Sequence, residues 1–473
     1  MPALKAKVLI MQKKTKLGLS SIIFFVLSGL IGIDGLAPAA SVGPSVFGWW
    51  LLIILLFVLP YVFIVCELSA AFPGEGGIYE WTLRGMGSKN AARVSWYYWI
   101  NVPFWIPSVY LICGGMLSEL FWPDMSIWGM IGIAIVMVWA TVFVANASMD
   151  TGKLVNTIGG ISKVAIMLAF SVGGYMLIAN NGEPAVELTL ESMKPSMGAS
   201  FIYAPTLIYM FLGVETVACM GSSIKNPERN LPLGILIAIS IIVVLYWLAT
   251  SSMIMAIPQE NLSLVGGLVQ TLQILFGNTG IGHVITITLS LLAVLGLFTY
   301  IIPWIMAASR AAVEAANAQE MPAIFAVTNK NGSPYGSNML TGTIATVALV
   351  IYGFIAGNAD DLFWSLFAFA NFLLFITYFF FFISFVRLRT LEPDVKRPFK
   401  IPGGNGVAIL IALVPAILLI VACLLFVFPD ILVGVIDWEY SSPTIIAIVL
   451  ALLLIELSIN KLRKTQQVVE QGE

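Results

Sequence analysis

Long apolar stretches separated by short polar segments make up almost the whole chain, and this pattern limits it to a membrane-spanning fold. A helix needs about 20 mostly apolar residues to cross the hydrocarbon core of a bilayer. Of the 473 residues, 59% are hydrophobic and 10% are charged, whereas soluble domains carry about 25% charged residues. We therefore predict an all-α membrane protein. Twelve transmembrane helices are expected near residues 19–42, 46–72, 93–122, 126–146, 155–180, 200–222, 232–257, 281–312, 338–357, 361–386, 405–428 and 443–461.

Basic residues alternate between the two sides of these spans. Of the 23 Lys and Arg, 21 fall before the first span, in loops that follow an even-numbered span, or after the last span. The exceptions are Lys194, in an opposite loop, and Lys163, inside the fifth span. Because Lys and Arg are retained on the cytoplasmic side, we predict a cytoplasmic-membrane protein with both termini in the cytoplasm. No small-residue cleavage site follows the basic start, so we expect a retained first span.

Two spans carry residues that interrupt a helix. Residues 29–38 of the first span hold three glycines, a proline and Asp34, and residues 203–216 of the sixth span hold Gly213 and Glu215. Glycine and proline weaken a helix, so both helices should break near mid-membrane. Broken first and sixth spans are the corresponding members of two five-helix halves, and an odd repeat inserts its second copy upside down. We predict an inverted five-plus-five repeat.

This organisation divides the chain into five parts. They are a cytoplasmic N-terminal segment, two inverted repeats, an added pair of spans and a cytoplasmic tail: 1–18, 19–180, 200–386, 405–461 and 462–473.

The sequence lacks the residue patterns that several functions require. The chain has one histidine, His283, and its four cysteines, Cys66, Cys113, Cys219 and Cys423, lie singly inside apolar runs. They are expected to be small buried hydrophobes, with no metal and no cofactor bound. No nucleophile–base pair is visible, and no basic stretch is interleaved with aromatic residues. We therefore expect neither an enzyme nor a nucleic-acid-binding protein.

Six motifs carry a resemblance to a known family. They are 66–81 (CELSAAFPGEGGIYEW), 211–215 (FLGVE), 225–232 (KNPERNLP), 321–326 (MPAIFA), 329–334 (NKNGSP) and 397–404 (RPFKIPGG). Together with the broken first span, they resemble the amino acid–polyamine–organocation transporters over roughly residues 19–404. The segment 321–334 is similar to bacterial antiporters that exchange an amino acid or amine for its decarboxylation product, and 397–404 resembles the glutamate/γ-aminobutyrate antiporters. The resemblance implies alternating access, in which spans one, two, six and seven rock against the rest.

Asp34 departs from the family pattern. In the amino-acid carriers of this family the first-span break is a small-residue stretch whose free backbone N–H groups bind the substrate's α-carboxylate. A carboxylate at mid-bilayer costs about 2.5–3.5 kcal/mol, and it would repel a second one. We expect Asp34, between Gly32 and Gly35, to bind the amino group of an amine. The alternative is that Asp34 only caps the half-helix that starts near Pro38.

Three further charged residues inside the predicted spans have an expected role. Lys163 resembles a fifth-span lysine of sodium-independent members, whose ammonium replaces the sodium ion that bridges spans one and eight; the alternative is a salt bridge that only holds helices together. Glu215 is expected to be a proton site or a second cation anchor, or else a structural cap of the sixth-span break. Glu67, near the cytoplasmic end of the second span, is expected to be structural.

Aromatic residues complete the expected substrate site. Trp304 aligns with an eighth-span tryptophan that lines the site in the arginine/agmatine branch, and cation–π stacking on Trp suits an ammonium or guanidinium group. Tyr209 aligns with a sixth-span aromatic gate of that branch. Asn101 and Trp105 form a third-span polar and aromatic pair, and Asn371 is a weaker candidate. For the aromatic residues, packing is the alternative role.

We therefore predict an antiporter that exchanges cationic amines, with agmatine and putrescine preferred. Its partners would be small-molecule amine or amino-acid substrates and the lipid bilayer, and the protein would be a monomer or homodimer. The rival is an amino acid/amine antiporter, such as a tyrosine/tyramine exchanger. A channel or a transporter-like receptor would be a different class, disfavoured by two mid-span breaks without a pore loop and by the lack of an appended cytoplasmic domain.

Overall fold

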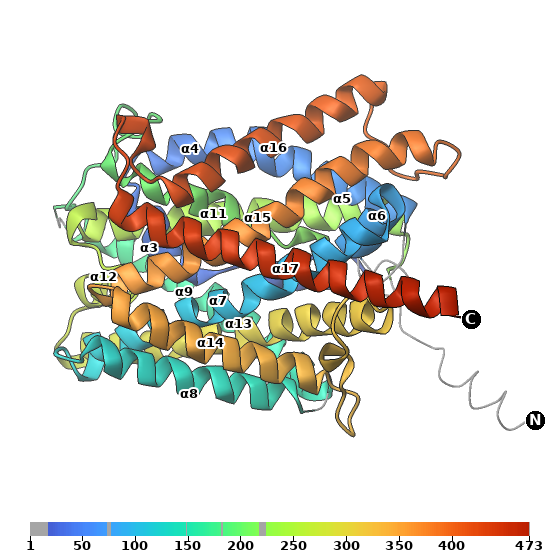
Figure 1. Ribbon diagram of the computed structural model, residues 1–473. Coiled ribbons are helices and arrows are strands. Elements are labelled where there is room, and N and C mark those ends of the chain that lie inside the picture. Colours follow the sequence, from blue (N-terminus) through green and yellow to red (C-terminus); the bar gives the residue numbers. More distant parts are fainter. Residues whose placement is uncertain (1–17, 73–76, 148, 181–182, 217–223, 473) are drawn as a thin grey trace, which may run out of the picture.

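The computed structural model describes residues 18–72, 77–147, 149–180, 183–216 and 224–472. Within these ranges the regular structure is helical, as the length and apolar content of the spans predict. Long helices lie side by side in one bundle (Figure 1). Residues 73–76 of the second-span motif and Cys219 lie outside the described ranges, as do the side chains of 149–157.

Ten described helices are long and apolar enough to cross a membrane. The second span is continuous because a π-helical turn, Ile54–Val58, joins its two α-helices. The ten are α4–α5 (Val46–Ala71), α7 (Ser88–Phe121), α8 (Ile127–Ala145), α9 (Met149–Ala179), α11 (Pro227–Ala256), α13 (Gly280–Asn317), α14 (Tyr335–Ile355), α15 (Ala359–Leu391), α16 (Gly404–Val427) and α17 (Trp438–Gly472).

The first and sixth predicted spans differ from these ten. The first is an eleventh, bent span: α2 (Leu19–Leu30) continues through a short 3₁₀ turn, η1 (Ile33–Gly35), into α3 (Leu36–Ser41) with a bend of 43°. The sixth contains a shorter apolar helical segment, Phe201–Thr216, which includes η3 (Ala199–Tyr203) in part and α10 (Pro205–Tyr209). Its predicted continuation at 217–222 lies outside the described residues, so the twelve-span count and the inverted repeat stay predictions.

Three helical segments were not expected from the sequence. α6 (Gly77–Met86) lies between the second and third spans, and α12 (Gly267–Phe276) lies between α11 and α13. α17 continues through the segment expected to be a tail, because the Lys, Gln and Glu residues there favour a helix once it has started.

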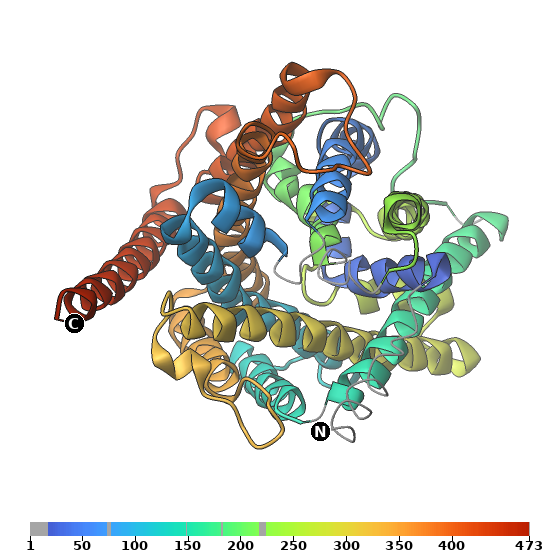
Figure 2. The ribbon, with the colours of Figure 1, turned by 90° about the vertical axis from the view of Figure 1, so that its right-hand side faces the viewer.

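The most buried helices hold the middle of the bundle. In the most apolar 18-residue stretch of each helix, the buried share is 83% in α7 and 72% in α15, but 17% in α17. The end-on view shows α17 at the edge of the molecule (Figure 2). The last helix is therefore peripheral, and the interior lies around α7 and α15.

Candidate functional site

The break in the first span leaves backbone groups without helical partners. α2 ends at Leu30, and Ile31 and Gly32 take extended conformations before the 3₁₀ turn. The Gly32 N–H donates to the Tyr246 hydroxyl of α11 at 2.9 Å, and that hydroxyl donates to the Leu30 carbonyl at 3.1 Å. In a continuous helix the Gly32 N–H would have bonded to the Ser28 carbonyl. The break thus frees the Ser28 carbonyl for another donor.

Glycines permit close packing at both breaks. Gly213, after α10, has φ +106°, a conformation that favours glycine, and a Cβ there would lie 3.0 Å from the Trp304 ring. A Cβ on Gly35 would lie 2.7 Å from Cγ of Met210. Both glycines therefore permit close approach, and Gly35 brings the first break against the sixth span.

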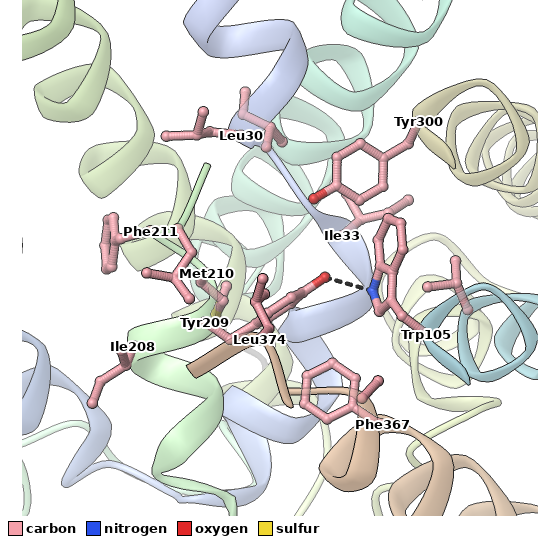
Figure 3. Packing of buried hydrophobic residues seen from close by; sticks show 14 of the residues in the cluster. Leu30, Ile33, Trp105, Ile208, Tyr209, Met210, Phe211, Tyr300, Phe367 and Leu374 are labelled. Carbon is pink, nitrogen blue, oxygen red and sulfur yellow. Dashed lines mark hydrogen bonds between the residues drawn. The ribbon is translucent and has the colours of Figure 1, made fainter. Parts of the chain in front are cut away.

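Asp34 lies buried at this junction, 1% exposed. Its Oδ2 accepts a hydrogen bond from the Tyr209 hydroxyl at 2.7 Å and a longer one from Trp105 Nε1 at 3.4 Å. Trp105 Nε1 also donates to the Tyr209 hydroxyl at 2.8 Å. Figure 3 shows this hydrogen bond beside Tyr300 and Ile33. The other oxygen, Oδ1, has no hydrogen-bond partner. One oxygen of a buried carboxylate is therefore fixed and the other is free to bind a donor.

Lys163, on α9, joins three spans. Its Nζ donates to the Ser28 carbonyl at 2.6 Å and lies 4.0 Å from the centroid of the Tyr300 ring on α13. No described carboxylate lies within 4 Å of the ammonium. The lysine thus connects spans one, five and eight through a freed carbonyl and an aromatic face, and not through an ion pair.

Glu215 is held by two tyrosines. One carboxylate oxygen accepts a hydrogen bond from the Tyr61 hydroxyl on α5, and the other accepts one from the Tyr378 hydroxyl on α15 at 3.0 Å. Glu215 itself is 3% exposed. Because both of its oxygens already have donors, Glu215 links the sixth span to the second and tenth spans, whereas Asp34 keeps a free oxygen.

Trp304 packs against Trp105, which bonds to Asp34, whereas the side-chain amide of Asn101 bonds within its own helix. The ring centroids of Trp304 and Trp105 are 5.8 Å apart, and Trp304 is partly buried. The Asn101 amide donates to the Tyr98 carbonyl of its own helix at 2.5 Å, and Asn371 similarly donates to the Phe367 carbonyl at 2.8 Å.

Sequence reasoning missed four tyrosines that shape the site. Tyr246 bonds to both sides of the first-span break, Tyr300 lies under the Lys163 ammonium, and Tyr61 and Tyr378 hold Glu215. A chain with 14 Tyr and 29 Phe gives no signal that separates these from packing residues. A tyrosine inside an apolar span whose hydroxyl needs a partner is the one pattern that points to them.

Glu67 lies in a separate buried cluster. Arg389 of α15 donates to its two oxygens at 2.8 and 2.5 Å, the Ile401 N–H donates at 2.8 Å, and Arg397 Nε lies 3.4 Å away. The motif 397–404 therefore packs on the C-terminal end of the second span, which supports the structural role expected for Glu67.

The site is closed to solvent in this structure. Asp34, Trp105 and Tyr209 are 1%, 4% and 8% exposed. An interrupted apolar span beside a buried carboxylate, inside a bundle of apolar helices, is typical of a multi-pass membrane transporter. The sequence profile described as "Amino acid permease" matches residues 17–454, so the chain belongs to the amino acid permease family.

Named relatives span most of the chain. It is 30% identical over 418 residues to the probable agmatine/putrescine antiporter AguD of Lactococcus lactis, which covers 88% of this chain and 89% of the relative. It is 26% identical over 412 residues to an uncharacterized transporter of Legionella pneumophila, covering 85% and 88%. A glutamate/gamma-aminobutyrate antiporter of Lactococcus lactis is 24% identical over 360 residues, covering 74% and 71%.

Proposed function

We propose that the protein is an antiporter of the cytoplasmic membrane that exchanges cationic amines, with agmatine and putrescine as the preferred pair. The observation that carries the proposal is the buried Asp34 carboxylate, whose Oδ1 has no partner. An ammonium group would give that oxygen a charge-assisted hydrogen bond. The name of the Lactococcus lactis relative, a probable agmatine/putrescine antiporter, supports the same substrates.

In this proposal each side chain around Asp34 has a separate task. Tyr209 and Trp105 hold Oδ2 and so orient Oδ1 toward the amine. Trp304 offers its ring face to the far cationic end of the substrate. Lys163 supplies the positive charge that a coupling sodium ion would otherwise supply between spans one, five and eight.

Exchange proceeds by alternating access in a twelve-span inverted repeat with both termini in the cytoplasm. One substrate binds at a time between the broken spans, and spans one, two, six and seven move as a unit. Within this frame the Tyr61–Glu215 bond lies inside the moving unit, whereas the Tyr378–Glu215 bond joins it to the tenth span. The second bond would therefore have to change when the site opens.

The second candidate is an antiporter that exchanges an amino acid for its amine. The observation in its favour is the pair of buried charges Asp34 and Lys163, which together carry no net charge and so suit a zwitterion. The name of the glutamate/gamma-aminobutyrate antiporter among the relatives is consistent with this exchange.

Counterflow distinguishes the two candidates. Proteoliposomes loaded with putrescine are diluted into labelled agmatine, and parallel samples are tested with amino acids against their decarboxylation products. We expect agmatine to accumulate only when putrescine is inside. Accumulation of an amino acid against its amine, with no agmatine entry, would instead establish the second candidate. Unitary currents in a planar bilayer would contradict both and indicate a channel.

A further inference from the structure

The first backbone donor that the helix break frees is already occupied. Tyr246 accepts from the Gly32 N–H at 2.9 Å and donates to the Leu30 carbonyl at 3.1 Å. The carbonyls of Gly32 and Met210 each lie 3.5 Å from the same hydroxyl. One buried phenol thus satisfies backbone groups on both sides of the first break. It also lies against the first turn that follows α10.

The Asp34 carboxylate lies against Gly32, beside the first backbone donor that the break frees. Its Oδ2 accepts hydrogen bonds from Tyr209 and Trp105. A Cβ on Gly32 would lie 2.5 Å from Asp34 Oδ1 and 3.1 Å from the Tyr300 hydroxyl. The space at Oδ1 is therefore narrow and negatively charged, and the Gly32 N–H beside it already donates to Tyr246. A group entering there has to bring hydrogen-bond donors.

We propose that Tyr246 and Asp34 together determine substrate specificity: they admit primary amines and exclude the matching amino acids that carry a carboxylate on the amine-bearing carbon. Tyr246 removes the Gly32 N–H as a donor, and Asp34 repels the carboxylate while it binds the ammonium. This inference rests on the proposed amine exchange. It narrows the substrate class of that site to amines without an α-carboxylate.

Putrescine and ornithine are the matched probes, because ornithine is putrescine with one added α-carboxylate. The Tyr246 ring stacks on Trp50 at a centroid distance of 6.2 Å and contacts Phe211 edge-on at 5.9 Å. Tyr246→Phe therefore keeps the ring packing and removes the hydroxyl. Tyr110→Phe is the matched control, since it removes a buried hydroxyl that bonds to Thr141, between α7 and α8.

Binding of both probes is measured on the purified full-length protein, wild type and variants. We expect the wild type to prefer putrescine by at least about tenfold, since a charge-assisted hydrogen bond accounts for a tenfold or larger difference. Tyr246→Phe should lower that preference about tenfold by strengthening ornithine binding. Tyr110→Phe should leave the preference unchanged. Asp34→Gly alone should lose putrescine and gain no ornithine binding, whereas Asp34→Gly with Tyr246→Phe should bind ornithine.

Three results would overturn the inference. The first is equal binding of ornithine and putrescine by the wild type, and the second is the same preference in Tyr246→Phe as in the wild type. The third is ornithine binding by Asp34→Gly alone, which would show that Tyr246 blocks nothing. The Asp34→Gly variant also tests the inference if Tyr246→Phe does not fold. Counterflow tests the proposed function separately, since a wild type that exchanges no amine contradicts that function and not only its specificity.

Discussion

Asp34 is the residue on which the substrate chemistry depends. It is 1% exposed, one oxygen is fixed by Tyr209, and the other is without a partner. A residue that only capped a helix would direct its oxygen to a backbone N–H in the first turn after it. The hydrogen bonds to Tyr209 and Trp105 come from other spans, and they orient the carboxylate across the site.

We expect Asp34→Asn to abolish amine binding and uptake while the protein still folds. Removing a buried charge that costs about 2.5–3.5 kcal/mol to place at mid-bilayer should not lower the melting temperature. Binding and thermal unfolding of the purified protein measure the two effects. Asp394→Asn, at an exposed acid between α15 and α16, is the control and should behave as wild type. Wild-type transport by Asp34→Asn would leave Asp34 with the capping role alone.

Trp304 is expected to contribute a moderate share of the affinity. Cation–π contacts contribute about 0.5–2 kcal/mol, so Trp304→Leu should weaken amine binding roughly twofold to thirtyfold, with Trp304→Phe intermediate. The control is Trp438→Leu, at a ring that is 61% exposed on the peripheral helix α17. Equal affinities in the Trp304→Leu variant and the wild type would remove Trp304 from the site.

At the scale of elements, the broken first span depends on its neighbours. Its freed groups are satisfied by Tyr246 of α11 and Lys163 of α9. An unsatisfied backbone group in a membrane interior costs several kcal/mol, so the break is stable only where other helices supply partners. The glycines permit the break, and the neighbouring helices stabilise it.

The position of the Lys163 ammonium between spans one, five and eight predicts transport that does not depend on sodium. Its ammonium already bridges the first and fifth spans and lies over Tyr300 of the eighth, so no metal cation is needed there. Replacing sodium by choline on both sides of proteoliposomes should leave the exchange rate unchanged. Potassium-for-choline exchange is the ionic control. Uptake driven by an imposed sodium gradient would contradict the prediction.

The Glu67 cluster is expected to stabilise the fold. Glu67→Gln leaves Arg389, 3% exposed, as an uncompensated buried charge, and such a loss costs about 3–5 kcal/mol. Thermal unfolding should show a clear drop. Glu80→Gln breaks an ion pair with Arg84, which is 46% exposed, and should cost less than about 1 kcal/mol. Similar losses in the two variants would show that the buried pair does not hold the motif 397–404 in place.

At the scale of the whole molecule, the two candidate functions differ in the charge that they move. Agmatine and putrescine are both dications near neutral pH, so the rate of one-for-one exchange should not depend on the membrane potential. Exchange of a zwitterion for a monocation moves one charge and should respond by about 2.3 kcal/mol per 100 mV. Labelled agmatine entry into putrescine-loaded liposomes is followed at valinomycin-clamped potentials of zero and of either sign. A rate that depends steeply on the sign would contradict amine-for-amine exchange.

The sequence by itself determined which segments are buried in apolar surroundings and where the first of them breaks. Apolar length, glycine and proline act locally, and so ten spans, the bend at residues 31–35 and the burial of Asp34 and Lys163 follow from residues close together in the chain. The sixth span was predicted by the same pattern, but its full length is not described. The family resemblance indicated Tyr209 as a site residue, but its hydrogen bond with Trp105 was not predicted.

The tertiary structure decided which side chains satisfy the breaks and which acid keeps a free oxygen. Gly32 meets Tyr246 across 214 residues, and Glu67 meets Arg389 across 322. No local pattern fixes such partners, because they depend on how whole helices pack. Asp34 and Glu215 look alike in the sequence, as acids beside glycines in broken spans. They differ because packing brings two phenols to separate oxygens of Glu215 and leaves Asp34 Oδ1 without a donor.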